Sequence, residues 1–149
     1  MALIFNLLWF ILGGGFFACL FWLLCGLLLC ITVIGIPFGI AAFRIASFAA
    51  FPFGKELIDA RKIGEIRIPT TGLANFLWII LAGLWLAIGH VLAAIALFVT
   101  IIGIPFALAH IKLAQVSFAP LGKRIVSKDV SKAANLRAAN DNLDKRFKK

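Results

Sequence analysis

The stretch TVIGIPFGIAAFRIASFAAFPFGK, residues 32–55, decides the fold because the chain contains it twice. Residues 100–123 read TIIGIPFALAHIKLAQVSFAPLGK and align with it without a gap, 68 positions further on. A shorter match precedes each copy, Asn-Leu-Leu-Trp at 6–9 and Asn-Phe-Leu-Trp at 75–78, which lie 69 positions apart. Self-similarity of this length identifies an internal duplication, so the fold should consist of two related units.

The Gly-Ile-Pro motif predicts a helix break in each copy. Proline lacks an N–H and disfavours helical geometry at the preceding residue, so one helix should end near residue 34, and near 102 in the second copy. Glycine allows unusual backbone dihedrals at such a break. A new helix of about fifteen residues should begin at the proline and stop before Pro52 or Pro120. The residues of the two predicted breaks are Gly35, Pro37, Gly103 and Pro105.

The composition is that of a membrane protein. The chain is 63% hydrophobic with a mean hydropathy of +1.08, whereas soluble domains are typically about 45–50% apolar. Residues 1–43 and 68–111 contain no charged side chain. Each run is long enough to cross a bilayer about twice at roughly 20 residues per crossing, and helices satisfy their own backbone in lipid. We therefore predict an all-α integral membrane protein, with two tandem repeats of a broken-helix hairpin and about four membrane segments.

The charge distribution predicts the orientation of these segments. Thirteen of the fifteen basic residues lie in residues 55–67 and 123–149, and such stretches stay on the cytoplasmic side. Both termini should then be cytoplasmic, with the copies related by a pseudo-twofold axis along the membrane normal. The rival arrangement has one crossing per copy and a shorter in-plane or re-entrant segment, because the second helix is short. Since topology alone requires these basic residues, we expect no nucleic-acid partner.

These patterns divide the chain into four parts: membrane repeat 1 at 3–59, a cytoplasmic linker at 60–72, membrane repeat 2 at 73–127 and a tail at 128–149. In the tail, apolar residues recur at spacings of three and four among Lys and Arg. This pattern predicts a basic amphipathic helix that binds anionic lipid or a partner protein. The residues of the apolar stripe are Leu136, Ala139, Leu143 and Phe147.

The paired Ile-Gly-Ile-Pro-Phe stretches, the closing Phe-Pro-Phe-Gly-Lys and Ala-Pro-Leu-Gly-Lys-Arg, and the opening Asn-x-x-Trp resemble the YccF family of bacterial inner membrane proteins. The resemblance covers roughly residues 3–127. The second copy departs from the first at Ala107, where the first has Gly39, and at Lys112, where the first has Arg44. The resemblance implies an inner-membrane location and a repeated domain, and it supplies no activity or catalytic residue.

Arg44 and Lys112 are the first candidate functional residues, because they are basic residues within apolar surroundings at one position of the repeat. A cation at the centre of a membrane helix costs about 2.5–3.5 kcal/mol, so it usually faces a cavity, a polar partner or the headgroups. Ser47 and Gln115 follow three residues later on the same helix faces and are candidate polar partners. The two cations are expected to snorkel to headgroups, to line an anion-attracting passage or to bind lipid phosphate.

His90 lies in the middle of a predicted segment, where we expect it to form a hydrogen bond with a neighbouring helix; the alternative is a role in proton relay. All six acidic residues fall in the charged stretches, so acid–base pairs and carboxylate metal sites within the membrane lack their groups. The three cysteines have no metal-binding spacing. We therefore predict no enzyme activity, no cofactor and no metal site.

Two functions remain after these exclusions. Four short helices enclose little space, so a conducting protein would need several subunits around the path. The first hypothesis is a homo-oligomer that forms a small pore or ion conduit, with Arg44 and Lys112 near it. The alternative is a structural or regulatory membrane component whose basic tail binds lipid or a partner protein. Both predict a multi-pass protein of the bacterial inner membrane with membrane lipids as partners.

Overall fold

The computed structural model describes residues 2–66 and 68–147 of the chain. The first copy of the repeat forms three helices, a strand and a 3-10 turn. In chain order these are α1 (Ala2–Leu12), α2 (Gly15–Cys30), α3 (Ile36–Ala50), β1 (Lys55–Asp59) and η1 (Ala60–Ile63).

The second copy repeats this order and ends in a long helix. Its elements are α4 (Thr71–Trp78), a π-helical turn η2 (Ile79–Gly83), α5 (Leu84–Phe98), α6 (Ile104–Phe118), β2 (Lys123–Ser127) and α7 (Lys128–Phe147). The α2–α3 hairpin thus corresponds to the α5–α6 hairpin, and each hairpin turns within the predicted Gly-Ile-Pro region.

Each hairpin turn is closed by the threonine of the repeat. The Thr32 hydroxyl donates to the carbonyl of Leu29 at 3.2 Å and accepts from the N–H of Gly35 at 3.1 Å. Gly35 has an ordinary helical φ of −78°, so the expectation of unusual dihedrals there is wrong. Glycine is required instead because a Cβ would lie 2.1 Å from the Leu29 carbonyl oxygen. The second turn has the same bonds, made by Thr100, Leu97 and Gly103.

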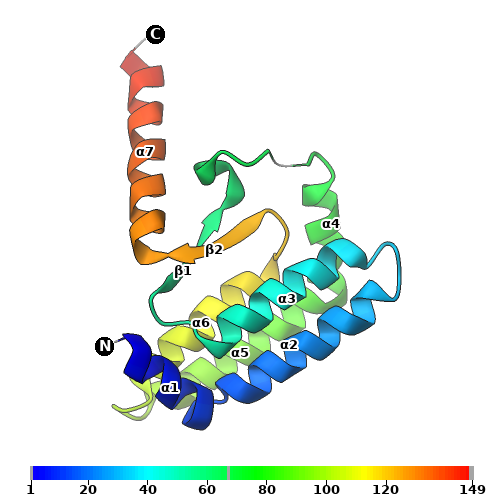
Figure 1. Ribbon diagram of the computed structural model, residues 1–149, viewed down its shortest axis with the longest axis vertical. Helices are drawn as coiled ribbons and strands as arrows, with labels where there is room; N and C mark the ends of the chain where they lie inside the picture. The colour runs from blue at the N-terminus through cyan, green and yellow to red at the C-terminus, as the bar shows by residue number, and fades with distance from the viewer. Residues whose placement is uncertain (1, 67, 148–149) are drawn as a thin grey trace.

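The two hairpins lie antiparallel, with their turns at opposite ends of the helical body (Figure 1). Phe106, near the start of α6, packs on Trp9 with ring centroids 5.9 Å apart. The Trp9 indole N–H donates to the carbonyl of Ala49, near the end of α3, at 2.6 Å. The start of one long helix therefore lies beside the end of the other. The equivalent contacts are the Trp78 ring on Phe38 at 5.1 Å and the Trp78 indole N–H to the Ser117 carbonyl at 2.8 Å.

A two-stranded antiparallel sheet joins the copies, which corrects the prediction of an all-helical fold. Leu57 of β1 pairs with Ile125 of β2, and these residues occupy the same position of the repeat. A local twofold axis therefore passes between them. Strands of five residues that pair only across the two copies leave no local signal in the sequence.

The sheet covers one side of the helical body. Figure 1 shows α3 and α6 next to the sheet, α2 and α5 on the side away from it, and α7 standing clear of the body. Burial follows the same order, since α3 and α6 bury seven or more residues each while α5 buries Ala94 alone. The core is aromatic at its centre, where Trp9, Trp22 and Phe48 are fully enclosed.

Few of these helices are long enough to cross a bilayer. In the described part of the chain, the continuous helix at Thr71–Phe98 meets that requirement, and α1 with α2 would be a second span only if counted together. Those two helices are bent by 74° at their break. The hairpin helices α3 and α6 have 15 residues each. The structure thus offers one or two such helices where the sequence predicts about four segments.

Candidate functional site: two cation-lined pockets

The Asn-x-x-Trp motif fixes the loop that leads into each strand. The Asn6 side chain donates to the carbonyl of Phe53 at 3.0 Å and accepts from its N–H at 2.9 Å. Asn75 makes the same pair of bonds with Leu121, at 3.0 and 3.1 Å. The sequence marks this asparagine as part of the repeat but gives no indication of its partner, which lies more than forty residues away.

The Gly-Lys pair that closes each repeat turns the chain from helix to strand. Gly54 and Gly122 have φ values of +85° and +77°, which other residues rarely adopt. The Lys123 ammonium donates to the Gln115 carbonyl near the end of α6 at 2.9 Å. Burial lowers the pKa of Lys123, and the Asp59 carboxylate opposite it in the sheet partly offsets that effect.

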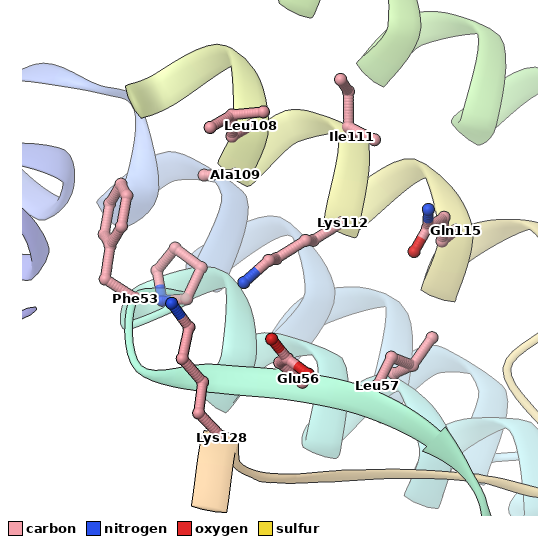
Figure 2. A pocket seen from close by; sticks show the side chains of 10 residues that line it. Phe53, Glu56, Leu57, Leu108, Ala109, Ile111, Lys112, Gln115 and Lys128 are labelled. Carbon is pink, nitrogen blue, oxygen red and sulfur yellow. The ribbon is translucent and has the colours of Figure 1, made fainter. Parts of the chain in front are cut away.

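A cavity of about 500 Å³, here called the lysine pocket, lies between α6, β1 and the start of α7. Figure 2 shows the ammonium groups of Lys112 and Lys128 directed into it, with the Glu56 carboxylate on the Lys112 side of the pocket. The Lys112 ammonium donates to the backbone carbonyl of Lys55 at 2.9 Å. The Glu56 carboxylate accepts from the Ser131 hydroxyl at 2.9 Å. The lining residues used below are Phe53, Glu56, Leu108, Ile111, Lys112 and Lys128.

A second cavity of about 350 Å³, the arginine pocket, occupies the equivalent place in the first copy. Arg44 takes the position of Lys112, and Arg124 takes that of Glu56. The Arg124 guanidinium forms an ion pair with Glu65, with Nε 2.7 Å from Oε1. The lining residues used below are Phe38, Arg44, Glu65, Leu121 and Arg124.

Arg44 and Lys112, the two predicted candidate cations, thus line two separate pockets beside the sheet. Gln115 lines the lysine pocket with Lys112. The side chain of Ser47 is exposed, and its backbone carbonyl accepts from Lys55 at 3.4 Å. The pairing of Ser47 with Arg44 stays a prediction.

His90 lies against the neighbouring helix, with its Nδ1 3.0 Å from Nδ1 of His110 on α6. In the first copy Trp22 and Ala42 occupy these two positions. The Trp22 indole N–H is buried and has no hydrogen-bond partner among the described residues. A large and a small residue in one copy thus replace two residues of intermediate size in the other.

The helical body has an apolar surface, and the sheet and α7 form a basic platform on one side of it. This arrangement is typical of a membrane protein. The chain matches the YccF family, described as an inner membrane component domain, at residues 4–55 and again at 73–123. It is 34% identical over 139 residues to the inner membrane protein YccF of Escherichia coli strain K12, and the match covers 90% of this chain and 93% of that protein. The same protein of Shigella flexneri matches equally, and no solved structure matches the chain. The chain therefore belongs to the YccF family of inner membrane proteins.

Proposed function

We propose that this protein is a one-sided component of the inner membrane, with a structural or regulatory role and no catalytic activity. Its helices lie within the cytoplasmic leaflet, and its sheet and α7 form a basic platform at the cytoplasmic surface. The observation that carries this proposal is the position of the sheet across the antiparallel hairpins (Figure 1).

The sheet restricts how the body can sit in a bilayer. If α3 and α6 ran along the membrane normal, the sheet beside them would lie near the middle of the hydrocarbon. Lys55, Glu56 and Lys123 would then be immersed there, at about 2.5–3.5 kcal/mol for each charge. With the helices along the membrane plane, the sheet lies at the surface. Within residues 2–66 and 68–147, every charged side chain belongs to a strand, to a segment following a strand or to one of the two pockets.

The hairpin turns support the same orientation. Ile34 is 86% exposed and Ile101 87% exposed, and no charged residue lies in either turn. A turn in water would normally carry polar residues, whereas hydrocarbon favours these side chains. Thr32 and Thr100 satisfy backbone groups of the turns, as a turn within lipid requires.

The lengths of α3 and α6 and the outer faces of α2 and α5 agree with this arrangement. The helix at Thr71–Phe98 is long enough to cross a bilayer, but its α5 part forms a hairpin with α6 and therefore shares the orientation of α6. Each hairpin helix α3 or α6 has 15 residues and is about 22 Å long at 1.5 Å per residue, short of the roughly 30 Å hydrocarbon core. α2 and α5 carry no charged residue, and their outward leucines, such as Leu28 and Leu92, are more than half exposed. Basic residues remain on the cytoplasmic side, which orients the platform.

Cysteine accessibility tests the proposal. The three native cysteines are replaced by serine, and single cysteines are introduced as Val33→Cys, Ile101→Cys and Ala138→Cys. A membrane-impermeant maleimide should label the α7 cysteine in inverted vesicles only, and the two turn cysteines from neither side until detergent is added. Labelling of either turn cysteine from the periplasm would contradict one-sided insertion; because the two turns lie at opposite ends of the body (Figure 1), labelling of one turn from each side would show that the hairpin helices cross the bilayer.

The homo-oligomeric pore stays a prediction, and it requires contacts between several copies of the chain. The exposed apolar faces of α2 and α5 would have to pack against other copies around a conducting path. Chloride flux in liposomes from purified protein, lost in the Arg44→Gln/Lys112→Gln variant, would favour the pore. Absence of flux from the parent protein favours the one-sided component.

A further inference from the structure

We propose that the lysine pocket binds the phosphodiester group of an anionic phospholipid such as phosphatidylglycerol. The inference deepens the proposed function, because it assigns a lipid site to the boundary between the apolar body and the basic platform. It rests on the charges of the pocket, its apolar wall and its difference from the arginine pocket.

The two lysines supply donors aimed at one space (Figure 2). An ammonium group has three N–H donors, and Lys112 uses one of them on the Lys55 carbonyl. Lys128 lies at the first residue of α7, where the helix N-terminus also favours an anion. A phosphate between the two ammonium groups would accept from both.

The net charge of the pocket selects the kind of phosphate. Two ammonium groups and the Glu56 carboxylate sum to one positive charge. The Ser131 hydroxyl holds the carboxylate on the wall. One positive charge matches a phosphodiester, which carries one negative charge, better than a phosphomonoester dianion.

The apolar wall identifies the ligand as a lipid rather than free phosphate. Phe53, Leu108 and Ile111 line the same cavity as the lysines, and Leu108 is 50% exposed. In the proposed orientation these side chains adjoin the hydrocarbon, where an acyl chain lies when its phosphate is at the lysines.

The arginine pocket has the same net charge, from Arg44, Arg124 and Glu65, but one of its two cations is already paired. The Arg124 guanidinium forms an ion pair with Glu65, and the cavity is smaller, at about 350 Å³. Binding should therefore occur in the second copy's pocket and depend little on Arg44.

Retention of lipid by the purified full-length protein, measured by native mass spectrometry in detergent, tests the site. The Lys112→Gln/Lys128→Gln variant should bind phosphatidylglycerol about tenfold more weakly or worse, since each lost charge removes on the order of a severalfold preference. The Lys145→Gln/Arg146→Gln variant, which removes the same charge far along α7, should bind within about twofold of the parent. Equal losses in both variants would overturn the proposal, because the attraction would then be a general surface effect.

Glu56→Gln separates this proposal from its nearest rival. It should strengthen phosphatidylglycerol binding, whereas weaker binding would mean that Glu56 recognises a cationic headgroup and that the anionic ligand is wrong. Glycerophosphate at the same concentration should not displace the lipid; displacement would indicate a soluble phosphate ligand instead. Lys128→Gln alone leaves the Lys112 hydrogen bond intact and gives a readout if the double variant fails to fold. None of these measurements depends on how the helices lie in the membrane, so they can fail independently of the one-sided topology.

Discussion

In both copies of the repeat a glycine packs against the indole of the preceding tryptophan, but the backbone between the two residues follows a different path in each copy. Gly15 and Gly83 each lie against the indole of the preceding tryptophan, where a Cβ would come within 2.4 Å of Trp9 Nε1 and 2.9 Å of Trp78 Nε1. One residue more separates Trp9 from Gly15 than separates Trp78 from Gly83. The first copy accommodates it with Gly14 at φ +81°.

The consequence is a broken helix in one copy and a continuous one in the other. α1 and α2 meet at 74°, while Thr71–Phe98 runs on through the π-helical turn. A π turn is often a functional feature of a helix; here it directly follows Trp78, whose indole N–H donates to the Ser117 carbonyl near the end of α6. The comparison teaches that the tryptophan and asparagine contacts define the unit, and that the chain between them adapts.

The largest expected effect removes the shared contact from either copy. Trp9→Ala should lower the free energy of unfolding by about 3–5 kcal/mol, because it empties a fully buried site and leaves the Ala49 carbonyl without its donor. Trp78→Ala should cost a similar amount. Denaturant unfolding in detergent, followed by helical circular dichroism, measures both.

Trp85→Ala is the matched control for this pair, since Trp85 is 68% exposed and its loss should change stability by no more than about 0.5 kcal/mol. A large loss at Trp9 with none at Trp78 would mean that the two copies are not held by the same contact.

A medium effect on stability is expected for Gly39→Ala, which gives the first copy the residue that the second copy has at this position. Ala107 is buried in α6, whereas its counterpart Gly39 lies where a Cβ would be 2.3 Å from the Cys30 sulfur and 2.9 Å from the Gly26 carbonyl oxygen. Gly39→Ala should therefore destabilise by about 1–3 kcal/mol through overpacking. The melting temperature in detergent reports the change.

Gly89→Ala provides the comparison substitution, because nothing lies within 4 Å of the added Cβ and alanine favours a helix by about 1 kcal/mol over glycine. A Gly39→Ala variant as stable as Gly89→Ala would show that α2 and α3 are free to separate.

The smallest expected effect is a coupling between two positions. Ala42→His should crowd Trp22, whereas Trp22→His with Ala42→His should recreate the His90–His110 pair in the first copy. The double variant should be about 0.5–3 kcal/mol more stable than the sum of the single effects predicts. A double-mutant cycle in the same unfolding assay measures this coupling, and strict additivity would show that the residues do not share a site.

Some residues of the candidate site could be predicted from the sequence, and others could be identified only from the structure. The sequence alone identifies Arg44 and Lys112, because two cations in apolar surroundings at one repeat position are conspicuous. It does not identify Lys128 or Glu56, because surface charges in a basic stretch have no distinguishing pattern. These residues become part of a site only when β1 and α7 approach α6.

The sequence by itself determined the duplication, the apolar character, the separation of charge and the helix breaks, since each depends on local composition or on identity between residues 32–55 and 100–123. Only the tertiary structure decided that the two hairpins run antiparallel and that β1 pairs with β2. Those choices depend on contacts between residues more than forty positions apart, such as Asn6 with Phe53 and Trp9 with Phe106. The hydrophobic runs of the sequence determine how much apolar surface must be removed from water. Packing between distant segments decides which side of each helix is buried in the core and which side faces outward.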